Sequence, residues 1–372
     1  MNFSRPLSVA FALATLATAP SQAQPTPQPR PETVAAGLSH PWALAFLPDG
    51  RFLVTERPGH LRVIEADGRA RPPVEGLPPV VAAGQGGLLD VALDAGFGAN
   101  RTIYFCFSEA GPSGTNGTAL ARAVLSTDER RLDQVRVIFS QQPKVASRAH
   151  FGCRIAQGRD GTLFLTMGDR FSRSADAQRR DNHLGKVIRV DPEGRPPADN
   201  PFIGRPGALP AIWSYGHRNM QGATIGPDGR LWTHEHGAQG GDEINIVQAG
   251  RNYGWPVITH GVNYGGAPIG EGLKAKEGME QPLHQWTPSI APSGMAFLTS
   301  DRYGPAWKGS LLVGSLKFGY LDRIEVRDDK VVAEQKLLAS ARERIRDVRQ
   351  GPDGLIYVLT DEEDGKLIRL QP

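Results

Sequence analysis

The chain is poor in cysteine and has no large excess of charge of either sign. Its 372 residues include two cysteines, and 42 Lys and Arg residues against 39 Asp and Glu residues give a net charge of +3. Two cysteines are too few for a disulfide scaffold or a cysteine-based zinc site. A weak charge with both signs interspersed gives no reason to expect a nucleic-acid partner. Hydrophobic residues make up 40% of the chain, which excludes a disordered protein.

Common catalytic and cofactor-binding motifs are also missing. The sequence contains no C-x-x-C-H haem motif, no G-x-S-x-G nucleophile turn, no P-loop and no dinucleotide-binding glycine fingerprint. No segment shows a convincing helical period of apolar residues over about 11 positions. Beyond residue 23, no apolar run approaches the roughly 18 residues that a membrane-spanning helix requires. We therefore expect a protein built from strands, without a membrane span.

Residues 1–23 have the pattern of a secretory signal peptide. Arg5 precedes a short apolar run, and small residues at positions 21 and 23 suit a cleavage site. A buried N-terminal helix is the alternative interpretation. We expect residues 24–31, which are rich in Pro and Gln, to form a flexible tail, and residues 32–372 to form one domain. The signal peptide predicts export to the periplasm.

An exported protein meets oxidising conditions, in which its two cysteines can pair. Cys106 and Cys153 lie far apart in the sequence. A disulfide requires Cα atoms within about 7 Å, which the sequence alone cannot establish. The pairing therefore stays open at this stage.

One sequence pattern recurs along the chain: an alternating strand, a Pro-Asp-Gly or related turn, and a second strand. Asp-Gly supplies the positive φ that a tight hairpin needs. Further strands follow most copies, so each unit offers three or four antiparallel strands. Six units predict an all-β, six-bladed β-propeller with four-stranded antiparallel blades, and a pair of β-sandwiches explains the repeat poorly. The copies lie at residues 42–56, 88–109, 153–169, 222–237, 294–317 and 346–361.

Polar residues occupy loops at matching places in several units. His150 precedes the third copy and could be a base, a ligand or a packed core residue. Gln85 lies in a glycine-rich segment that is either an ordinary turn or a site of close approach to a ligand. The densest cluster surrounds the fourth copy and contains Arg218, Asn219 and His236. Binding and catalytic residues are commonly found in loops that a rigid scaffold positions.

Two kinds of ion site are conceivable near the fourth copy. His234 and His236 share one strand face, but no third neutral ligand is evident, so zinc is weakly supported. Asp242 and Glu243, among glycines, suit calcium better, with a solvated turn as the alternative.

Later units add cations. Lys317 lies in the fifth unit, and Arg344 and Arg346 fall on one face of a strand in the sixth. Together with Arg218 they predict a cationic ring, which is costly unless an anion meets it. The alternative is that the Arg344–Arg346 face lies in solvent. A polyanionic cofactor or substrate is the better interpretation.

These segments resemble the soluble PQQ-dependent sugar dehydrogenases, in particular the aldose sugar dehydrogenase branch. The resemblance extends from about residue 40 to residue 370. It is carried by GQGGLLDVALD, HFGCRIAQGRDGTLFLTMGDRF, SYGHRNMQG, EHGAQGGDEIN, NYGWP, GSLKFG and RIRDVRQGPDG. It implies a six-bladed propeller that oxidises the anomeric hydroxyl of an aldose to the lactone and reduces PQQ, which calcium polarises.

The same resemblance implies roles for individual residues. His150 would be the catalytic base, and Arg218 would stabilise developing negative charge. Carbonyls of Gly237 and Ala238 would bind the active-site calcium, and Glu243 with the carbonyl of Tyr253 a structural one. The implied cofactor contacts are Gln85, Arg218, Asn219, His236, Ser289, Lys317, Arg344 and Arg346, with Asp361 in addition.

Three positions depart from the better-known glucose dehydrogenases. Ala149 replaces an acidic residue before the base, His236 replaces a glutamine, and Gly237-Ala238 replaces a Gly-Pro pair. The first change removes a sugar contact, so we expect a broader range of aldoses. Electrons would pass to an external acceptor, and the protein would be a monomer or a homodimer. A calcium-dependent lactonase and a non-catalytic propeller that binds peptide or glycan are the rival interpretations.

Overall fold

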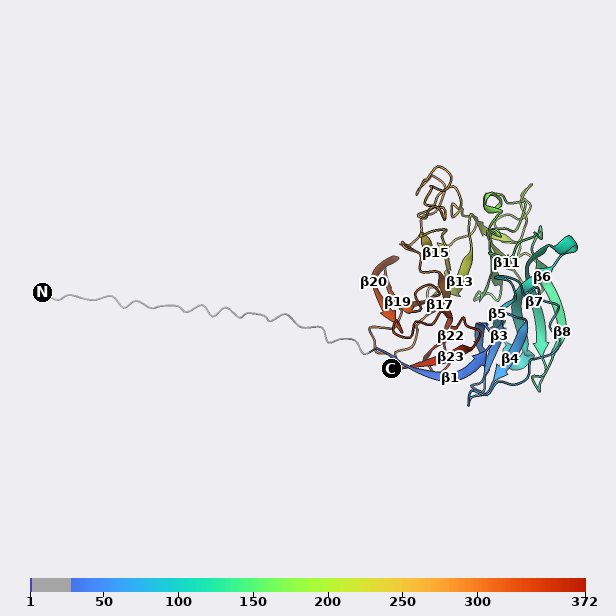
Figure 1. Ribbon diagram of the computed structural model, residues 1–372. Helices are drawn as coiled ribbons and strands as arrows, with labels where there is room; N and C mark the ends of the chain where they lie inside the picture. Colours follow the sequence, from blue (N-terminus) through green and yellow to red (C-terminus); the bar gives the residue numbers. More distant parts are fainter. Residues whose placement is uncertain (2–27) are drawn as a thin grey trace.

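The computed structural model describes residue 1 and residues 28–372. Within these residues it has six antiparallel sheets arranged in a ring, which confirms the six-bladed β-propeller (Figure 1). The first three blades contain β2 (Pro41–Phe46), β3 (Phe52–Glu56) and β4 (His60–Ile64); β5 (Leu88–Leu93), β6 (Thr102–Ala110), β7 (Asn116–Leu125) and β8 (Leu132–Ser140); and β9 (Gly152–Gln157), β10 (Leu163–Met167), β11 (Lys186–Val190) and β12 (Ile212–Tyr215).

The remaining blades follow the same order from the channel outward. They contain β13 (Met220–Ile225), β14 (Leu231–Glu235), β15 (Asp242–Val247) and β16 (His284–Trp286); β17 (Pro292–Phe297), β18 (Leu311–Ser315), β19 (Leu321–Arg327) and β20 (Lys330–Leu337); and β21 (Ile345–Gln350), β22 (Ile356–Thr360) and β23 (Gly365–Gln371) with β1 (Arg30–Leu38). Short helical turns occur at α1 (Phe97–Asn100), η1 (Pro112–Gly114) and η2 (Ser174–Gln178).

The innermost strands form the wall of the central channel. Each of β2, β5, β9, β13, β17 and β21 contacts the next one, and β21 contacts β2, so the ring closes. Most residues of these strands are buried because blades pack against both of their faces. Closure removes the exposed edges that an open sheet of this size would have.

The N-terminal strand completes the last blade. β1 pairs antiparallel with β23, with Arg30 opposite Gln371 and Glu32 opposite Arg369 (Figure 1). β1 therefore contains the last two residues of the predicted tail at residues 24–31, which are ordered in the sheet rather than flexible. The rest of that tail up to residue 27, and the predicted signal peptide apart from residue 1, lie outside the described residues.

The first blade is the least regular. It has three named strands, and an isolated antiparallel bridge from Ile64 to Ala70 takes the place of a fourth. Backbone hydrogen bonds from Arg71 to Val63 and from Val74 to Leu61 continue this contact along the outer edge. In the part of the chain that the structure describes, no helix is long and apolar enough to cross a membrane.

A cluster of four charged residues, three of them buried, joins inner strands of different blades. Arg154 of β9 lies 3.0 Å from Asp347 of β21 and 3.5 Å from Asp90 of β5. Arg349 contacts both carboxylates, at 2.9 and 3.0 Å. Because each charge is paired, the cluster is tolerated in the interior. The Arg154 guanidinium also packs 4.0 Å from the ring of Trp42, so the cluster supports the base of the cavity described next.

Candidate active site

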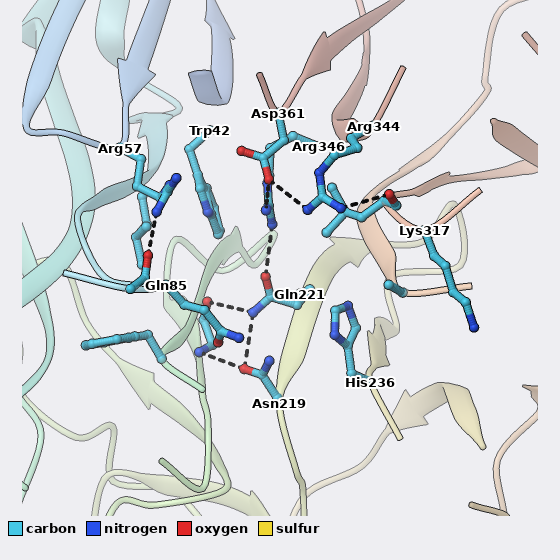
Figure 2. A pocket seen from close by; sticks show the side chains of 16 residues that line it. Trp42, Arg57, Gln85, Asn219, Gln221, His236, Lys317, Arg344, Arg346 and Asp361 are labelled. Atoms are coloured by element: carbon cyan, nitrogen blue, oxygen red, sulfur yellow. Dashed lines mark hydrogen bonds and ion pairs between the residues drawn. The ribbon is translucent and has the colours of Figure 1, made fainter. Parts of the chain in front are cut away.

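A cavity of about 500 Å³ lies at one end of the channel (Figure 2). Its lining comes from the inner strands, from the loops that precede them and from the loops that follow the second strands of several blades. The side chains that line it include Trp42, Arg57, Gln85, Asn219, Gln221, His236, Lys317, Arg344, Arg346 and Asp361. Most of the residues predicted to contact a cofactor are thus brought to one cavity, whereas Arg218 and Ser289 line neighbouring hollows.

Positive charge dominates one side of this cavity. Asp361 accepts hydrogen bonds from Arg346 at 2.5 Å and from Arg344 at 3.2 Å. These arginines hold the pKa of Asp361 far below its usual range, although burial opposes them. Burial lowers the pKa of Arg57, which also faces this group. With Lys317, the cavity lining has four cations and one carboxylate, and within the described residues the buried Nε of Arg346 has no partner. The arrangement suits an anionic ligand.

His150 lies beside the cavity and is held from two directions. Its backbone N–H donates to Oε1 of Gln85 at 2.7 Å, and its Nδ1 lies 2.6 Å from Oδ1 of Asp169. Its neighbours Phe151 and Gly152 line the cavity. Burial lowers the pKa of the imidazole, which the Asp169 carboxylate opposes. The neutral ring that this favours can accept a proton at Nε2 when Nδ1–H points to Asp169.

Asp169 is a functional candidate that the sequence analysis did not assign. Besides His150, its carboxylate accepts hydrogen bonds from the backbone N–H of Phe171 and the indole N–H of Trp255, each at 2.8 Å. It is fully buried. Three donors fix its orientation, so it can orient the histidine in turn. Its place at the end of the strand motif TMGD was the available signal.

Arg218 is buried and bound to the loop after β14. Its Nη1 donates to the carbonyl of Gly237 at 2.5 Å and to that of His236 at 3.1 Å. Its Nη2 donates to the hydroxyl of Tyr264 at 3.3 Å. The guanidinium therefore engages a carbonyl that the resemblance assigned to calcium, and it does so outside the main cavity.

The two histidines weighed as a metal pair are hydrogen-bonded to backbone instead. Nε2 of His234 lies 2.9 Å from the carbonyl of Gly294, and Nε2 of His236 lies 2.8 Å from that of Pro292. Because a carbonyl only accepts, each Nε2 carries the proton and cannot bind a metal. Burial lowers the pKa of His234 to about 3 and that of His236 to about 4. Across residues 28–372 no group of three or more His, Cys, Asp or Glu side chains could hold a metal.

Asp242 is buried and hydrogen-bonded, so it is not part of a solvated turn. It is fully buried and accepts hydrogen bonds from the backbone N–H of Gly237, at 2.9 Å, and of Ile290, at 2.8 Å. The hydroxyl of Ser289 also donates to it, at 2.7 Å. Its carboxylate therefore joins two loops. Ser289 lines an adjoining hollow of about 580 Å³ that shares His236 and Lys317 with the main cavity.

Glu243 and Tyr253 lie together, with Glu235, around a small hollow of about 10 Å³. Burial and the nearby charge of Glu235 raise the pKa of Glu243 to about 8. Its carboxylate receives one long hydrogen bond, from Asn245 at 3.4 Å. A carboxylate in this position would be stabilised by a cation.

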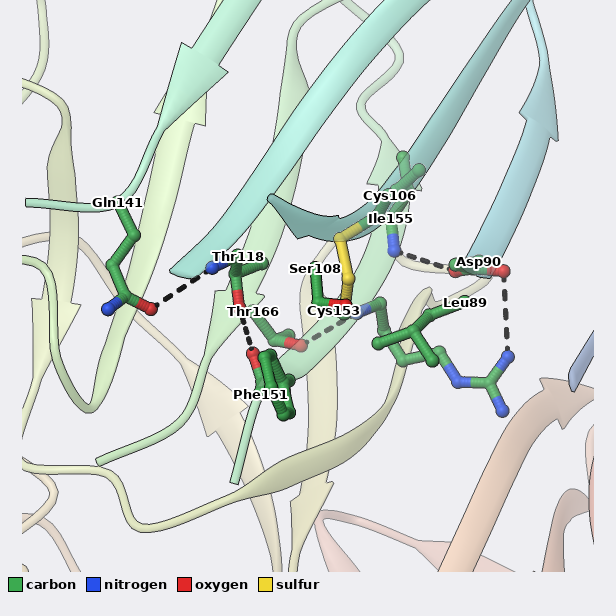
Figure 3. The surroundings of a disulfide bond; sticks show 12 residues. Leu89, Asp90, Cys106, Ser108, Thr118, Gln141, Phe151, Cys153, Ile155 and Thr166 are labelled. Carbon is green, nitrogen blue, oxygen red and sulfur yellow. Dashed lines mark hydrogen bonds and ion pairs between the residues drawn. A yellow bond between two sulfur atoms is a disulfide. The ribbon is translucent and has the colours of Figure 1, made fainter. Parts of the chain in front are cut away.

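The two cysteines, whose pairing the sequence left open, form a disulfide three residues after His150 in the chain (Figure 3). Cys106 of β6 and Cys153 of β9 have Cα atoms 5.7 Å apart, so the bond joins the second and third blades. In the same region the hydroxyl of Thr118 donates to the carbonyl of Phe151 at 2.7 Å. The backbone that follows His150 is thus tied to the neighbouring blade by covalent and hydrogen bonds.

Comparison with known proteins gives a consistent family. Residues 38–369 match the family model described as Glucose / Sorbosone dehydrogenase. The chain is 45% identical over 344 residues to aldose sugar dehydrogenase YliI of Escherichia coli, covering 92% of each chain. It is 27% identical over 414 residues to quinoprotein glucose dehydrogenase B of Acinetobacter calcoaceticus, covering 89% of this chain and 85% of that one.

Solved structures agree with the sequence comparisons. The apo form of the soluble aldose sugar dehydrogenase of E. coli has a TM-score of 0.89 at 44% identity, covering 92% of this chain and 99% of that one. The PQQ-bound form of an aldose sugar dehydrogenase from Streptomyces coelicolor has a TM-score of 0.76 at 29% identity, covering 94% and 99%. The chain therefore belongs to the glucose/sorbosone dehydrogenase family, and it is an oxidoreductase that acts on sugars.

Proposed function

We propose that this protein oxidises the anomeric hydroxyl of aldose sugars to lactones with PQQ as its cofactor and calcium as its metal. The observation that carries the proposal is the cationic cavity beside an aspartate-oriented histidine. A base and an anion-binding cavity side by side match a dehydrogenase whose cofactor is anionic. The PQQ-bound Streptomyces relative supports the choice of cofactor.

The residues of the cavity fit PQQ, which carries three carboxylates. Arg344, Arg346 and Lys317 would pair with the carboxylates, and the unpartnered Nε of Arg346 offers a free donor. Polar contacts would come from Gln85, Asn219 and His236. Ser289 and Arg218 would act from the adjoining hollows. When bound, PQQ supplies a two-electron acceptor for the hydride that leaves C1 of the sugar.

His150 would remove the proton of the anomeric hydroxyl. Asp169 holds Nδ1–H, so Nε2 is the nitrogen that receives the proton. As the C1 hydride leaves, the C1–O single bond becomes a C=O double bond and the lactone forms. The buried guanidinium of Arg218 adds fixed positive charge near His150, where it favours the developing negative charge and keeps the resting imidazole neutral.

The two calcium sites implied by the resemblance fit unequally. At Glu243 the half-buried, poorly hydrogen-bonded carboxylate, with Tyr253 beside it, would provide donors for calcium. At Gly237 and Ala238 the ligands would be neutral carbonyls, and the Gly237 carbonyl already accepts from Arg218. We therefore propose Glu243 as the stronger site and derive no catalytic step from the metal.

We also propose that residues 1–23 direct export to the periplasm, that an external molecule takes the electrons, and that the protein is a monomer or homodimer. The sequence has no haem attachment motif that could carry the electrons within the chain. N-terminal sequencing of the periplasmic protein tests the cleavage site. Size-exclusion chromatography with light scattering tests the oligomeric state.

Titration of metal-stripped protein with PQQ, with and without calcium, tests the main proposal. Dye reduction is then measured with a panel of aldohexoses and aldopentoses. We expect saturable activity that needs both additions, and a quinone absorbance that stays with the protein. Absence of tight PQQ binding would refute the proposal and favour a lactonase or a sugar-binding propeller, which a lactone-hydrolysis assay distinguishes.

A further inference from the structure

Two exposed aromatic side chains meet above the histidine and arginine of the proposed reaction. Phe171 is 56% exposed and Tyr264 is 65% exposed. Their ring centroids lie 6.5 Å apart and their planes differ by 29°, although they come from loops of different blades. Phe171 follows β10, and Tyr264 lies in the long connection between β15 and β16. We call these two residues the aromatic pair.

The aromatic pair is attached directly to the reaction machinery. The ring of Phe171 packs edge to face on His150, with centroids 5.2 Å apart. The hydroxyl of Tyr264 accepts a hydrogen bond from Arg218 at 3.3 Å. A substrate whose hydroxyl reaches His150 must therefore lie close to Phe171.

Phe171 is held in place at a conformational cost. Its φ is +67° and that of Arg170 is +59°, a left-handed backbone that is uncommon for bulky residues. The Phe171 N–H donates to Asp169 at 2.8 Å. On the other side, the buried guanidinium of Arg170 donates to the side chain of Asn116 at 2.6 Å and to the carbonyl of Ser147 at 2.8 Å. Two anchored neighbours thus hold an apolar ring in solvent. There the ring gains no hydrophobic stabilisation that would offset the backbone strain. Backbone strain of this kind is concentrated at functional sites.

We propose that the aromatic pair binds the apolar C–H face of the aldose ring while its anomeric hydroxyl lies at His150. This inference rests on the proposed function, because it assigns the substrate of the same site. In the proposed function the cationic cavity binds PQQ, which is anionic, so the aromatic pair is available to bind the uncharged aldose. Aromatic faces carry partial negative charge and attract the weakly positive C–H groups of a sugar. A ring face makes no hydrogen bonds to individual hydroxyls, so it favours a sugar ring without selecting one epimer.

Substitution of the pair tests the proposal in the PQQ- and calcium-loaded protein. Phe171→Ala and Tyr264→Ala should each raise KM for D-glucose and D-xylose about three- to tenfold and leave kcat within about twofold. Tyr264→Phe keeps the ring and loses the hydroxyl, so it should restore most of the affinity. Val332→Ala, which removes an exposed apolar side chain from β20, is the matched control and should leave both constants unchanged. Melting temperatures should stay within about 1 °C, since the pair is exposed.

A binding measurement makes the test independent of turnover. The probe is 1-deoxy-D-glucose, which has no anomeric hydroxyl to oxidise. Saturation-transfer NMR, with irradiation of the protein's aromatic protons, should label its ring C–H protons in the wild type and much less in Phe171→Ala and Tyr264→Ala.

Several outcomes would overturn the inference while leaving the proposed function intact. They are an unchanged KM in an active Phe171→Ala or Tyr264→Ala variant, a loss in kcat alone, and a Tyr264→Phe variant as impaired as Tyr264→Ala. A wild-type protein that binds PQQ and calcium but oxidises no aldose would instead refute the proposed function.

Discussion

Breaking the disulfide between Cys106 and Cys153 should destabilise the propeller substantially. The bond closes a loop of 47 residues and joins two blades three residues after His150 in the chain. Cross-linking removes conformations from the unfolded chain, and for this loop length the entropy model gives about 4 kcal/mol at 25 °C. With an unfolding entropy of about 0.7 kcal/mol/K for a domain of about 345 residues, Tm should fall by about 5–6 °C.

Two forms of the protein separate the crosslink from its packing. Wild-type protein refolded under reducing conditions keeps both sulfur atoms and loses only the bond. The Cys106→Ala, Cys153→Ala double variant also loses two fully buried sulfur atoms, so its Tm should fall further because small cavities remain.

Differential scanning calorimetry of the oxidised, reduced and double-variant proteins measures these differences. Scans at several rates show whether unfolding is reversible enough for the comparison. A Tm in the reduced wild type within about 2 °C of the oxidised form would refute the reasoning. It would mean that contacts between the second and third blades already restrict the unfolded chain or that the bond strains the folded one.

Four further predictions concern the site. His150→Ala should lower kcat about 10²–10⁴-fold with PQQ still bound. In the wild type, activity should fall as the pH falls, because the imidazole becomes protonated. Since the pKa of His150 is lowered, the midpoint of this acid limb should lie below pH 6.5. Asp169→Asn should lower kcat by a similar factor through loss of the histidine's orientation, and equal kcat in the wild type and Asp169→Asn would contradict this role. Arg346→Ala should weaken PQQ binding about 10- to 100-fold in a fluorescence titration, whereas an unchanged Kd would remove Arg346 from the cofactor site. Calcium should raise the Tm of metal-stripped wild type but not of Glu243→Gln, and an equal rise in both would exclude Glu243 as a ligand.

The amino-acid sequence determined the fold class because its information there is local and repeated. Six copies of a strand–turn–strand pattern, each too small to bury its own apolar faces, specify blades that must pack side by side. The sequence did not indicate that β1 completes the last blade beside β23, because this pairing joins residues more than 320 positions apart, such as Arg30 and Gln371. Nor did it predict the irregular first blade, in which a bridge at Ala70 replaces a strand.

For the candidate active site, too, some features follow from the sequence and others only from the tertiary structure. The types of residue that bind anions or accept protons are visible in the sequence, and Arg344, Arg346 and Lys317 do line one cavity. Their partners are set by the tertiary structure. Strand pairing within one blade brings Asp169 beside His150 and Asp361 beside Arg346. Packing between two blades brings Cys106 beside Cys153. The fold also places the side chains of His236 and Asp242 where they form hydrogen bonds with backbone groups. The sequence determines which chemical groups are present. The burial of these groups and the distances between them decide their hydrogen-bond partners and their protonation, and only the folded propeller sets both.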